Sequence, residues 1–332
     1  MTTVATGTST APIFVVGHPR SGTTLLRMIL DSHPRIVIPP EGHLVSLLRR
    51  AERKYGRLDD PDNFEMLVER LLHKQRMAEW KIDVEDARRR CLAGPHTPAG
   101  LFASLMSIWT ERTGKPRWGE KTPGTYRFLP EVNRWFPDCQ VVHIVRDGRD
   151  VAVSCLTPPF ADQYDKGDVY EVAVRWRDAI RRGRHAGGML GPQRYLELRY
   201  EDLTAAPEAV VRAVCQFLHE DFVPEMLKFH EKAAGKVPRG EQSYHQRVSN
   251  TVDSQRVERW RKDASEEFVL GFEGIAAKEL EENGYRLSGY AAPPALRGRI
   301  LLERLRPRNP VKHYKGPEAE RPVRPKGGKD SE

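Results

Sequence analysis

The chain has 332 residues, 39% of them hydrophobic and 30% charged, and its formal net charge is +8 at pH 7. This length predicts one elaborated globular domain with appendages, and no apolar run approaches the roughly 18 to 20 residues that a membrane-spanning helix needs. Residues 291–332 hold 11 Lys or Arg against 5 Asp or Glu, so most of the excess positive charge lies at the C-terminal end and no nucleic-acid partner is expected.

Residues 1–10 contain neither a basic stretch nor an apolar one, so we expect a disordered N-terminus, no signal peptide and a cytoplasmic location. No two cysteines have the C-x2-C spacing of a metal site, and three of the four lie in apolar runs. We therefore expect reduced cysteines in the core and no bound metal. The cysteines are Cys91, Cys139, Cys155 and Cys215.

The first predicted element is a strand, the apolar run Ile13–Val16, and a helix is predicted from Thr23 onward. Between them, Gly17 and Gly22 have the G-x4-G spacing of a phosphate-binding loop, in which backbone amides surround an anion at the start of a helix. The lysine of the nucleoside triphosphatase template is absent, because Thr23 and Thr24 stand where Lys and Ser or Thr would. The alternative is an ordinary glycine-rich turn.

A second strand-like run, 36–38, and two prolines lead to Glu41, our candidate for a general base. His43 is a second candidate, either as the base or as a substrate contact. The alternative for Glu41 is an ordinary acidic residue at a helix start. Residues 43–113 have apolar positions at helical spacing, which predicts a helical insert beside the phosphate loop, where an acceptor pocket would be built.

Further along, Lys121 lies in a Glu-Lys-Thr-Pro turn after a predicted strand and is a candidate for a catalytic cation; the alternative is an exposed turn lysine. The β-branched run 140–145 predicts a buried parallel strand, with Arg146 just past its carboxyl end and a helix from Asp147 to Ser154. Ligands bind at that edge of open α/β sheets. The alternative is a solvated surface pair of Arg146 and Asp150.

Later segments complete an α/β plan, a three-layer sandwich with a central parallel sheet. Helices are predicted at 125–136, 169–185, 207–218 and 266–282, and a strand ending in a turn at 194–203. The main domain is predicted to span 11–290. Residues 291–332 form a basic, proline-rich tail, largely disordered. Within it, Arg299–Arg306 has the pattern of a short basic amphipathic helix that touches anionic lipid or a partner, or else stays solvated.

Several motifs together resemble those of the sulfotransferases that use 3′-phosphoadenosine 5′-phosphosulfate. The resemblance covers most of residues 11–285. Within the family, the chain is most similar to the branch that contains the protein-tyrosine sulfotransferases and many bacterial relatives. The motifs are Pro19-Arg20-Ser21-Gly22-Thr23-Thr24-Leu25, Glu120-Lys121-Thr122-Pro123, Phe136-Pro137-Asp138, and Val142 to Val151 followed by Ser154.

The resemblance implies a role for each of these positions. Pro19, Arg20, Ser21, Gly22, Thr23 and Thr24 would hold the 5′-phosphate of the donor. Arg146 and Ser154 would hold its 3′-phosphate, and Ser249 or Asn250 would contact its bridging region. Glu41 would be the catalytic base, and Lys121 with Arg20 would neutralise the leaving side. The chain departs from the E-x-R pattern of the tyrosine-sulfating branch, because His43 stands where the arginine would.

The predicted activity is therefore metal-independent sulfuryl transfer from 3′-phosphoadenosine 5′-phosphosulfate to an acceptor hydroxyl or amine. A small molecule, a carbohydrate, a lipid and a peptide are all compatible acceptors, and no motif predicts an oligomeric state. The alternatives are a P-loop kinase or nucleoside triphosphatase, and a nucleotide-binding protein without catalysis.

Overall fold

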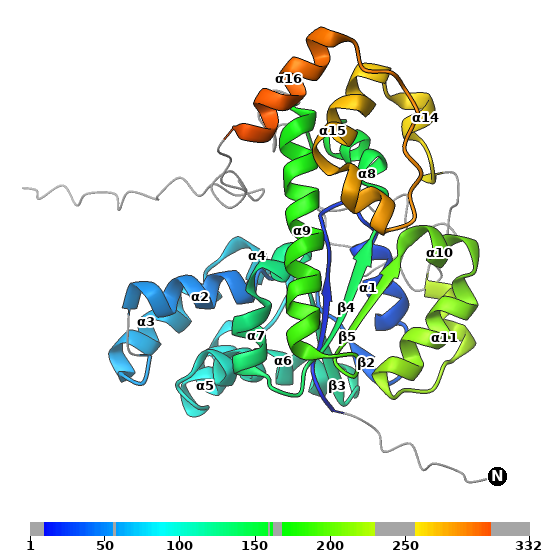
Figure 1. The fold of residues 1–332 in the computed structure, drawn as a ribbon. Helices are drawn as coiled ribbons and strands as arrows, with labels where there is room; N and C mark the ends of the chain where they lie inside the picture. Colours follow the sequence, from blue (N-terminus) through cyan, green and yellow to red (C-terminus); the bar gives the residue numbers. More distant parts are fainter. Residues whose placement is uncertain (1–9, 56–57, 159, 162–167, 230–255, 307–332) are drawn as a thin grey trace, which may run out of the picture.

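A computed structural model describes residues 10–55, 58–158, 160–161, 168–229 and 256–306 (Figure 1). Nine of the ten residues of the predicted N-terminal tail, and Ser249 with Asn250, lie outside the described residues. Among the described helices, none has both the length and the apolar character that crossing a bilayer requires.

Five parallel strands form the central sheet, in the order β2-β3-β1-β4-β5. The strands are β1 (Ile13–Val16), β2 (Ile36–Val37), β3 (Arg117–Lys121), β4 (Gln140–Val145) and β5 (Tyr195–Arg199). The first strand, β1, lies in the middle of the sheet, with β3 on one side and β4 on the other. The strand order therefore reverses direction at the carboxyl end of β1. This is the edge at which open α/β sheets bind ligands, and the predicted parallel sheet is confirmed.

Helices cover both faces of the sheet. Successive residues of β1 point to opposite sides, so each face of the strand packs against its own set of helices. Ile13 and Val15 pack in a cluster with α1 and α11, whereas Phe14 and Val16 pack in another with α2, α6, α7 and α9. These two clusters make the predicted three layers. The helices named here are α1 (Thr23–Asp31), α2 (Leu44–Tyr55), α6 (Pro98–Thr113), α7 (Leu129–Trp135), α9 (Val169–Leu190) and α11 (Pro207–Leu218).

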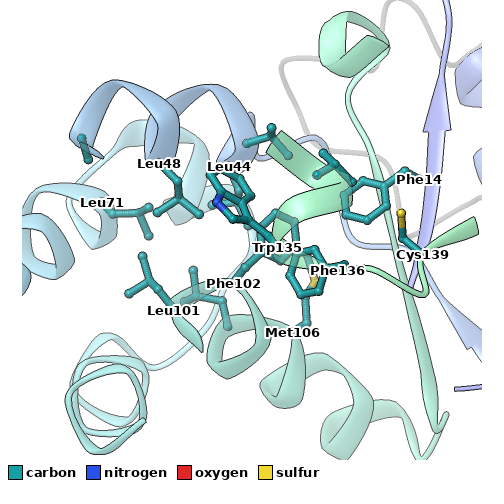
Figure 2. Packing of buried hydrophobic residues seen from close by; sticks show 14 of the residues in the cluster. Phe14, Leu44, Leu48, Leu71, Leu101, Phe102, Met106, Trp135, Phe136 and Cys139 are labelled. Atoms are coloured by element: carbon teal, nitrogen blue, oxygen red, sulfur yellow. The ribbon is translucent and has the colours of Figure 1, made fainter. Parts of the chain in front are cut away.

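The predicted insert at 43–113 contains five helices in the described residues, α2 to α6. Besides α2 and α6 these are α3 (Pro61–Leu72), α4 (Gln75–Glu79) and α5 (Val84–Ala93). Figure 2 shows that Leu44 of α2 and Phe102 of α6 pack toward Phe136 and Phe14. The ring centroids of Phe14 and Phe102 are 6.1 Å apart. Since β1 and the insert share one apolar core, the insert is attached rigidly to the sheet.

Two predicted elements differ in the structure. The helix expected at 125–136 is a 3-10 helix, η1 (Pro123–Phe128), followed by α7, because Pro130 has no N–H to continue the hydrogen bonds. In the segment 194–203, predicted as a strand that ends in a turn, the strand ends at Arg199 and the predicted turn is a short helix, α10 (Tyr200–Ala205).

The C-terminal part holds the remaining elements: α8 (Gly148–Cys155), η4 (Pro224–Lys228), α14 (Trp260–Asp263), α15 (Glu266–Glu282) and α16 (Pro294–Leu305). Gly284 ends α15 as predicted, with a φ of +75° and its N–H bonded to the carbonyl of Glu281. The tail predicted from 291 begins too early, because α16 packs on α15 through Leu296 and Ile300. Residues 307–332 lie outside the described residues.

Candidate active site

The turn between β1 and α1 has the geometry of an anion cradle. A Cβ on Gly17 would lie 2.5 Å from the carbonyl oxygen of Ile144, so the loop passes β4 this closely only because it has none. Gly22 has a φ of +98°, and a Cβ there would lie 2.5 Å from the ring of Tyr200. The first N–H groups of α1 have no acceptor within the helix, since the first such bond runs from Leu26 to Gly22. The six predicted 5′-phosphate residues, 19–24, all lie in this turn or the first turn of α1.

Two polar side chains of the loop are buried. Burial lowers the pKa of His18 to about 3, so its ring is neutral at physiological pH, and its Nδ1 lies 2.7 Å from the carbonyl oxygen of Pro19. The hydroxyl of Ser21 is buried without a hydrogen-bond partner in the described part of the chain. A buried polar atom of this kind is typical of a site whose partner is a ligand.

Arg20 directs its side chain toward Ser154, one of the two predicted 3′-phosphate residues. Its Nε donates to the Ser154 hydroxyl at 3.1 Å, and its guanidinium lies 3.9 Å from the centre of the Phe160 ring. Its backbone has a φ of +73°, which is strained for a residue with a side chain. In this structure the side chain of Arg20 thus contacts Ser154 and Phe160.

Arg146 joins the second motif to the first. Its side chain is buried at the carboxyl end of β4 and donates to the carbonyl of Arg20 at 3.3 Å and to that of Arg256 at 2.6 Å. Asp150 lies 3.5 Å away and is itself buried, so a solvated surface pair is wrong. Burial raises the pKa of Asp150 to about 6. The two predicted phosphate sites therefore lie side by side.

Glu41 and Lys121 meet on the other side of the loop. The Lys121 Nζ lies 2.7 Å from Oε2 of Glu41 and 3.5 Å from the hydroxyl of Thr24. The side chain of Lys121 is only 2% exposed and that of Glu41 13%. The alternative of an exposed turn lysine is therefore wrong, and this carboxylate and this cation stand together at the start of α1.

Buried contacts from α1 and from the insert position the Glu41 loop. Arg27 donates to the carbonyl of Ile38 at 3.0 Å, and Asp31 accepts from the N–H of the same residue at 3.0 Å. The indole N–H of Trp80 donates to the carbonyl of Pro40 at 3.0 Å, and its ring lies 2.9 Å from the place of a Cβ on Gly42. The residues on both sides of Glu41 are thus fixed, which limits the movement of its carboxylate.

His43 contacts Glu41, so the two candidate bases form one unit. Its Nε2 lies 3.2 Å from Oε1 of Glu41, the oxygen that does not face Lys121. Its φ of +53° turns the chain into α2, and its carbonyl accepts from the Leu47 N–H and the Ser46 hydroxyl. Strained backbone of this kind is concentrated at functional sites.

The end of β3 that carries Lys121 also holds the buried carboxyl group of Glu120, a motif residue to which the sequence assigned no role. Burial raises the pKa of Glu120 to about 7, and the Thr122 hydroxyl donates to one of its oxygens. The carbonyl of Pro123 accepts from the N–H of Gly17 at 3.1 Å. The Glu-Lys-Thr-Pro segment, which the structure places at the end of β3 and the start of η1, therefore also anchors the phosphate loop.

Sequence reasoning missed the support that Trp80, Glu120 and Thr122 provide. Trp80 was visible only as one of several aromatic residues of the insert, and nothing in its local pattern pointed to the Glu41 loop. The adjacency of Glu120 and Thr122 to Lys121 was the one available signal. Among the described residues, no group of three or more His, Cys, Asp or Glu side chains is arranged to hold a metal ion.

Known proteins match this chain in sequence and in fold. A family model described as "Sulfotransferase family" matches residues 12–224. A putative protein-tyrosine sulfotransferase of Caenorhabditis briggsae is 26% identical over 268 residues, which cover 80% of this chain and 85% of that protein. Protein-tyrosine sulfotransferase A of Caenorhabditis elegans is 25% identical over 285 residues, 82% of this chain and 67% of that protein. The sulfotransferase domain of the Synechococcus PCC 7002 olefin synthase has the same fold, with a TM-score of 0.59 and 23% identity over 83% of this chain and 95% of the domain.

Proposed function

This chain belongs to the sulfotransferase family and is an enzyme of that family, and we propose that it transfers a sulfuryl group from 3′-phosphoadenosine 5′-phosphosulfate to a hydroxyl or amine of an acceptor, with Glu41 as the base. The observation that carries this proposal is the buried pair of Glu41 and Lys121 beside Thr24 of the phosphate loop. It brings a proton acceptor and a cation to the place where a group held by that loop would react.

The donor would be held by two adjacent anion sites. The amides at the start of α1 and the hydroxyl of Ser21 suit the 5′-phosphate, and the guanidinium of Arg146 with the hydroxyl of Ser154 suits the 3′-phosphate. The hydrogen bonds from Arg20 to Ser154 and from Arg146 to the Arg20 carbonyl support this, because they join residues of the two proposed sites. Ser249 remains a proposed contact to the donor, outside the described residues.

Sulfuryl transfer needs a base for the acceptor hydroxyl, a cation beside the leaving oxygen, and in-line alignment of acceptor and donor. Glu41 takes the proton of the acceptor hydroxyl while the oxygen of that hydroxyl forms a bond to sulfur. At the same time the bond from sulfur to the bridging oxygen of the donor breaks, and the adenosine bisphosphate leaves. Lys121 neutralises the negative charge that this oxygen gains, in a buried site where such charge stabilisation is strong. We propose that Arg20 assists by moving toward the bridging oxygen once donor is present. None of these steps calls for a metal.

His43 is proposed to contact the acceptor and to orient Glu41. Its imidazole lies against the Glu41 oxygen that faces away from Lys121, so both can reach one acceptor hydroxyl. If Glu41 serves only to orient the ring, His43 becomes the base. Variants at the two positions separate these roles.

The acceptor is proposed to bind between the Glu41 loop and the helical insert. The names of the relatives make a tyrosine hydroxyl in a peptide the first acceptor to test, and small-molecule, carbohydrate and lipid hydroxyls follow. An acceptor screen with labelled donor answers this question without any mutation.

The decisive test replaces Glu41 by Gln, which keeps the size of the side chain and removes the base. We expect calorimetric affinity for 3′-phosphoadenosine 5′-phosphate to stay within about twofold and turnover to fall by about 100- to 10,000-fold. Glu52→Gln is a matched control, because Glu52 pairs with Arg134 on the outside of α2. A Glu41→Gln enzyme with parental turnover would rule out this base, and His43→Gln would then be the inactive variant. Binding of ATP with Mg²⁺ in place of the adenosine bisphosphate would instead indicate a kinase or triphosphatase.

A further inference from the structure

The helix α16 lies at the outer edge of the molecule, at the end to which the arrows of β4 and β5 point (Figure 1). Its inner face is well packed. Leu296 is 9% and Ile300 8% exposed, and Ile300 sits against Gly274 of α15, where a Cβ would lie 2.6 Å from it. The helix is therefore held in a defined orientation on the body of the protein.

The opposite face of α16 is also apolar. Leu301, Leu302 and Leu305 are 57%, 71% and 73% exposed, the largest values among the exposed large hydrophobic residues of the described chain. At about 100° per residue these three side chains share one face of the helix. With Gly298 they form a continuous strip without a polar group, which we call the leucine strip.

Arginines border the leucine strip on both sides. At the same helical spacing, Arg297 and Arg304 lie along one border and Arg299 and Arg306 along the other, and all four are exposed. The single acidic residue of the helix, Glu303, has a side chain only 17% exposed and lies toward the inner face. The sequence that follows, 307–332, has a net charge of +3.

We propose that the leucine strip and its arginines dock this protein on an anionic phospholipid surface, with α16 lying in the plane of the interface. Leucines enter the boundary of the acyl chains, while guanidinium groups on both borders reach lipid phosphates. The charge pattern favours lipid over a second copy of the chain, because a twofold contact through the strip would bring the arginine borders of the two copies against each other.

Flotation of the full chain with vesicles tests the proposal. We expect binding to phosphatidylcholine vesicles that contain phosphatidylglycerol, weak binding to pure phosphatidylcholine, and loss of binding as salt is raised. Replacement of Leu301, Leu302 and Leu305 together by Gln is expected to reduce binding by at least about tenfold. Replacement of Arg297 and Arg304 by Gln, which leaves Arg299 and Arg306 in place, is expected to reduce the preference for the anionic lipid.

The matched control is Met189→Gln, which changes an exposed apolar residue of α9, 53% exposed, and is expected to bind like the parent. Because the three leucines touch little, the melting temperature of the triple variant should match that of the parent. Two outcomes would overturn the proposal: a parent that does not bind anionic vesicles, and a triple variant that binds them fully. A dimer in sedimentation that the triple variant abolishes, without vesicle binding, would assign the strip to self-association instead.

Discussion

The strand-end side of the site and the helical insert support catalysis in different ways. On the strand-end side, Lys121 is the last residue of β3, Arg146 directly follows β4, and the loop 17–22 directly follows β1, so the sheet backbone places them. The insert reaches the Glu41 loop through side chains, chiefly the indole of Trp80. Substitutions on the first side should therefore damage donor binding, and those on the second should damage turnover with donor binding intact.

The largest effect is expected at Gly22. Gly22→Ala adds a Cβ against Tyr200 at a φ of +98°, and each of these two penalties costs about 1–3 kcal/mol. We expect kcat/KM for the donor to fall by at least about 100-fold. Gly188→Ala is the control, since its Cβ meets nothing within 4 Å; it should be neutral or slightly stabilising. Parental donor affinity in Gly22→Ala would show that the loop is not the donor site.

A somewhat smaller effect is expected at Arg146. Arg146→Lys keeps the charge and loses the planar fork, which should weaken calorimetric binding of 3′-phosphoadenosine 5′-phosphate by about 10- to 100-fold. Arg149→Lys is the control, because Arg149 is equally buried but bonds to Asp147 and Glu273. It should lower the melting temperature and leave nucleotide affinity unchanged. Equal losses of affinity in both variants would contradict the assignment.

A moderate effect confined to turnover is expected at Trp80. Trp80→Phe removes the hydrogen bond to the Pro40 carbonyl and should lower kcat by about two- to tenfold, with unchanged affinity for the adenosine bisphosphate. Trp109→Phe is a matched control from the same insert, since its indole nitrogen is buried without a hydrogen-bond partner among the described residues. If both variants lose kcat equally, Trp80 acts through general packing and the comparison fails.

The smallest effect on turnover, and a clear one on stability, is expected at Glu120. Burial raises the pKa of this carboxyl from 4.5 to about 7, so the folded protein binds more protons than the unfolded chain between these pH values. Its contribution to stability therefore falls as the pH rises through that window. Glu120→Gln stays neutral and should be more stable than the parent at pH 8, by about 1–3 kcal/mol, but not at pH 4.5. Denaturant midpoints at the two pH values measure this, and a pH-independent difference would contradict it.

The local sequence pattern was sufficient to predict the buried strands of the sheet and the phosphate loop. The predicted bounds of β1, β4, α11 and α15 agree with the structure, because the two strands are apolar runs and the two helices have apolar positions at helical spacing with clear ends. The predictions failed where a long-range or single-residue effect intervened. Pro130 divided a predicted helix, and packing on α15 ordered α16 within the predicted tail.

Glycine spacing and strand periodicity are local properties of the chain, so they were enough to predict the parallel sheet and the phosphate loop. The resemblance of the motifs added the candidates Glu41, Lys121, Arg146 and Ser154. Which of these residues touch depends on the packing of the whole fold. The Arg20–Ser154 bond joins residues 134 positions apart and the Trp80–Pro40 bond residues 40 apart. Such contacts depend on how the layers pack, and no pattern within one segment specifies the neighbour that another segment brings.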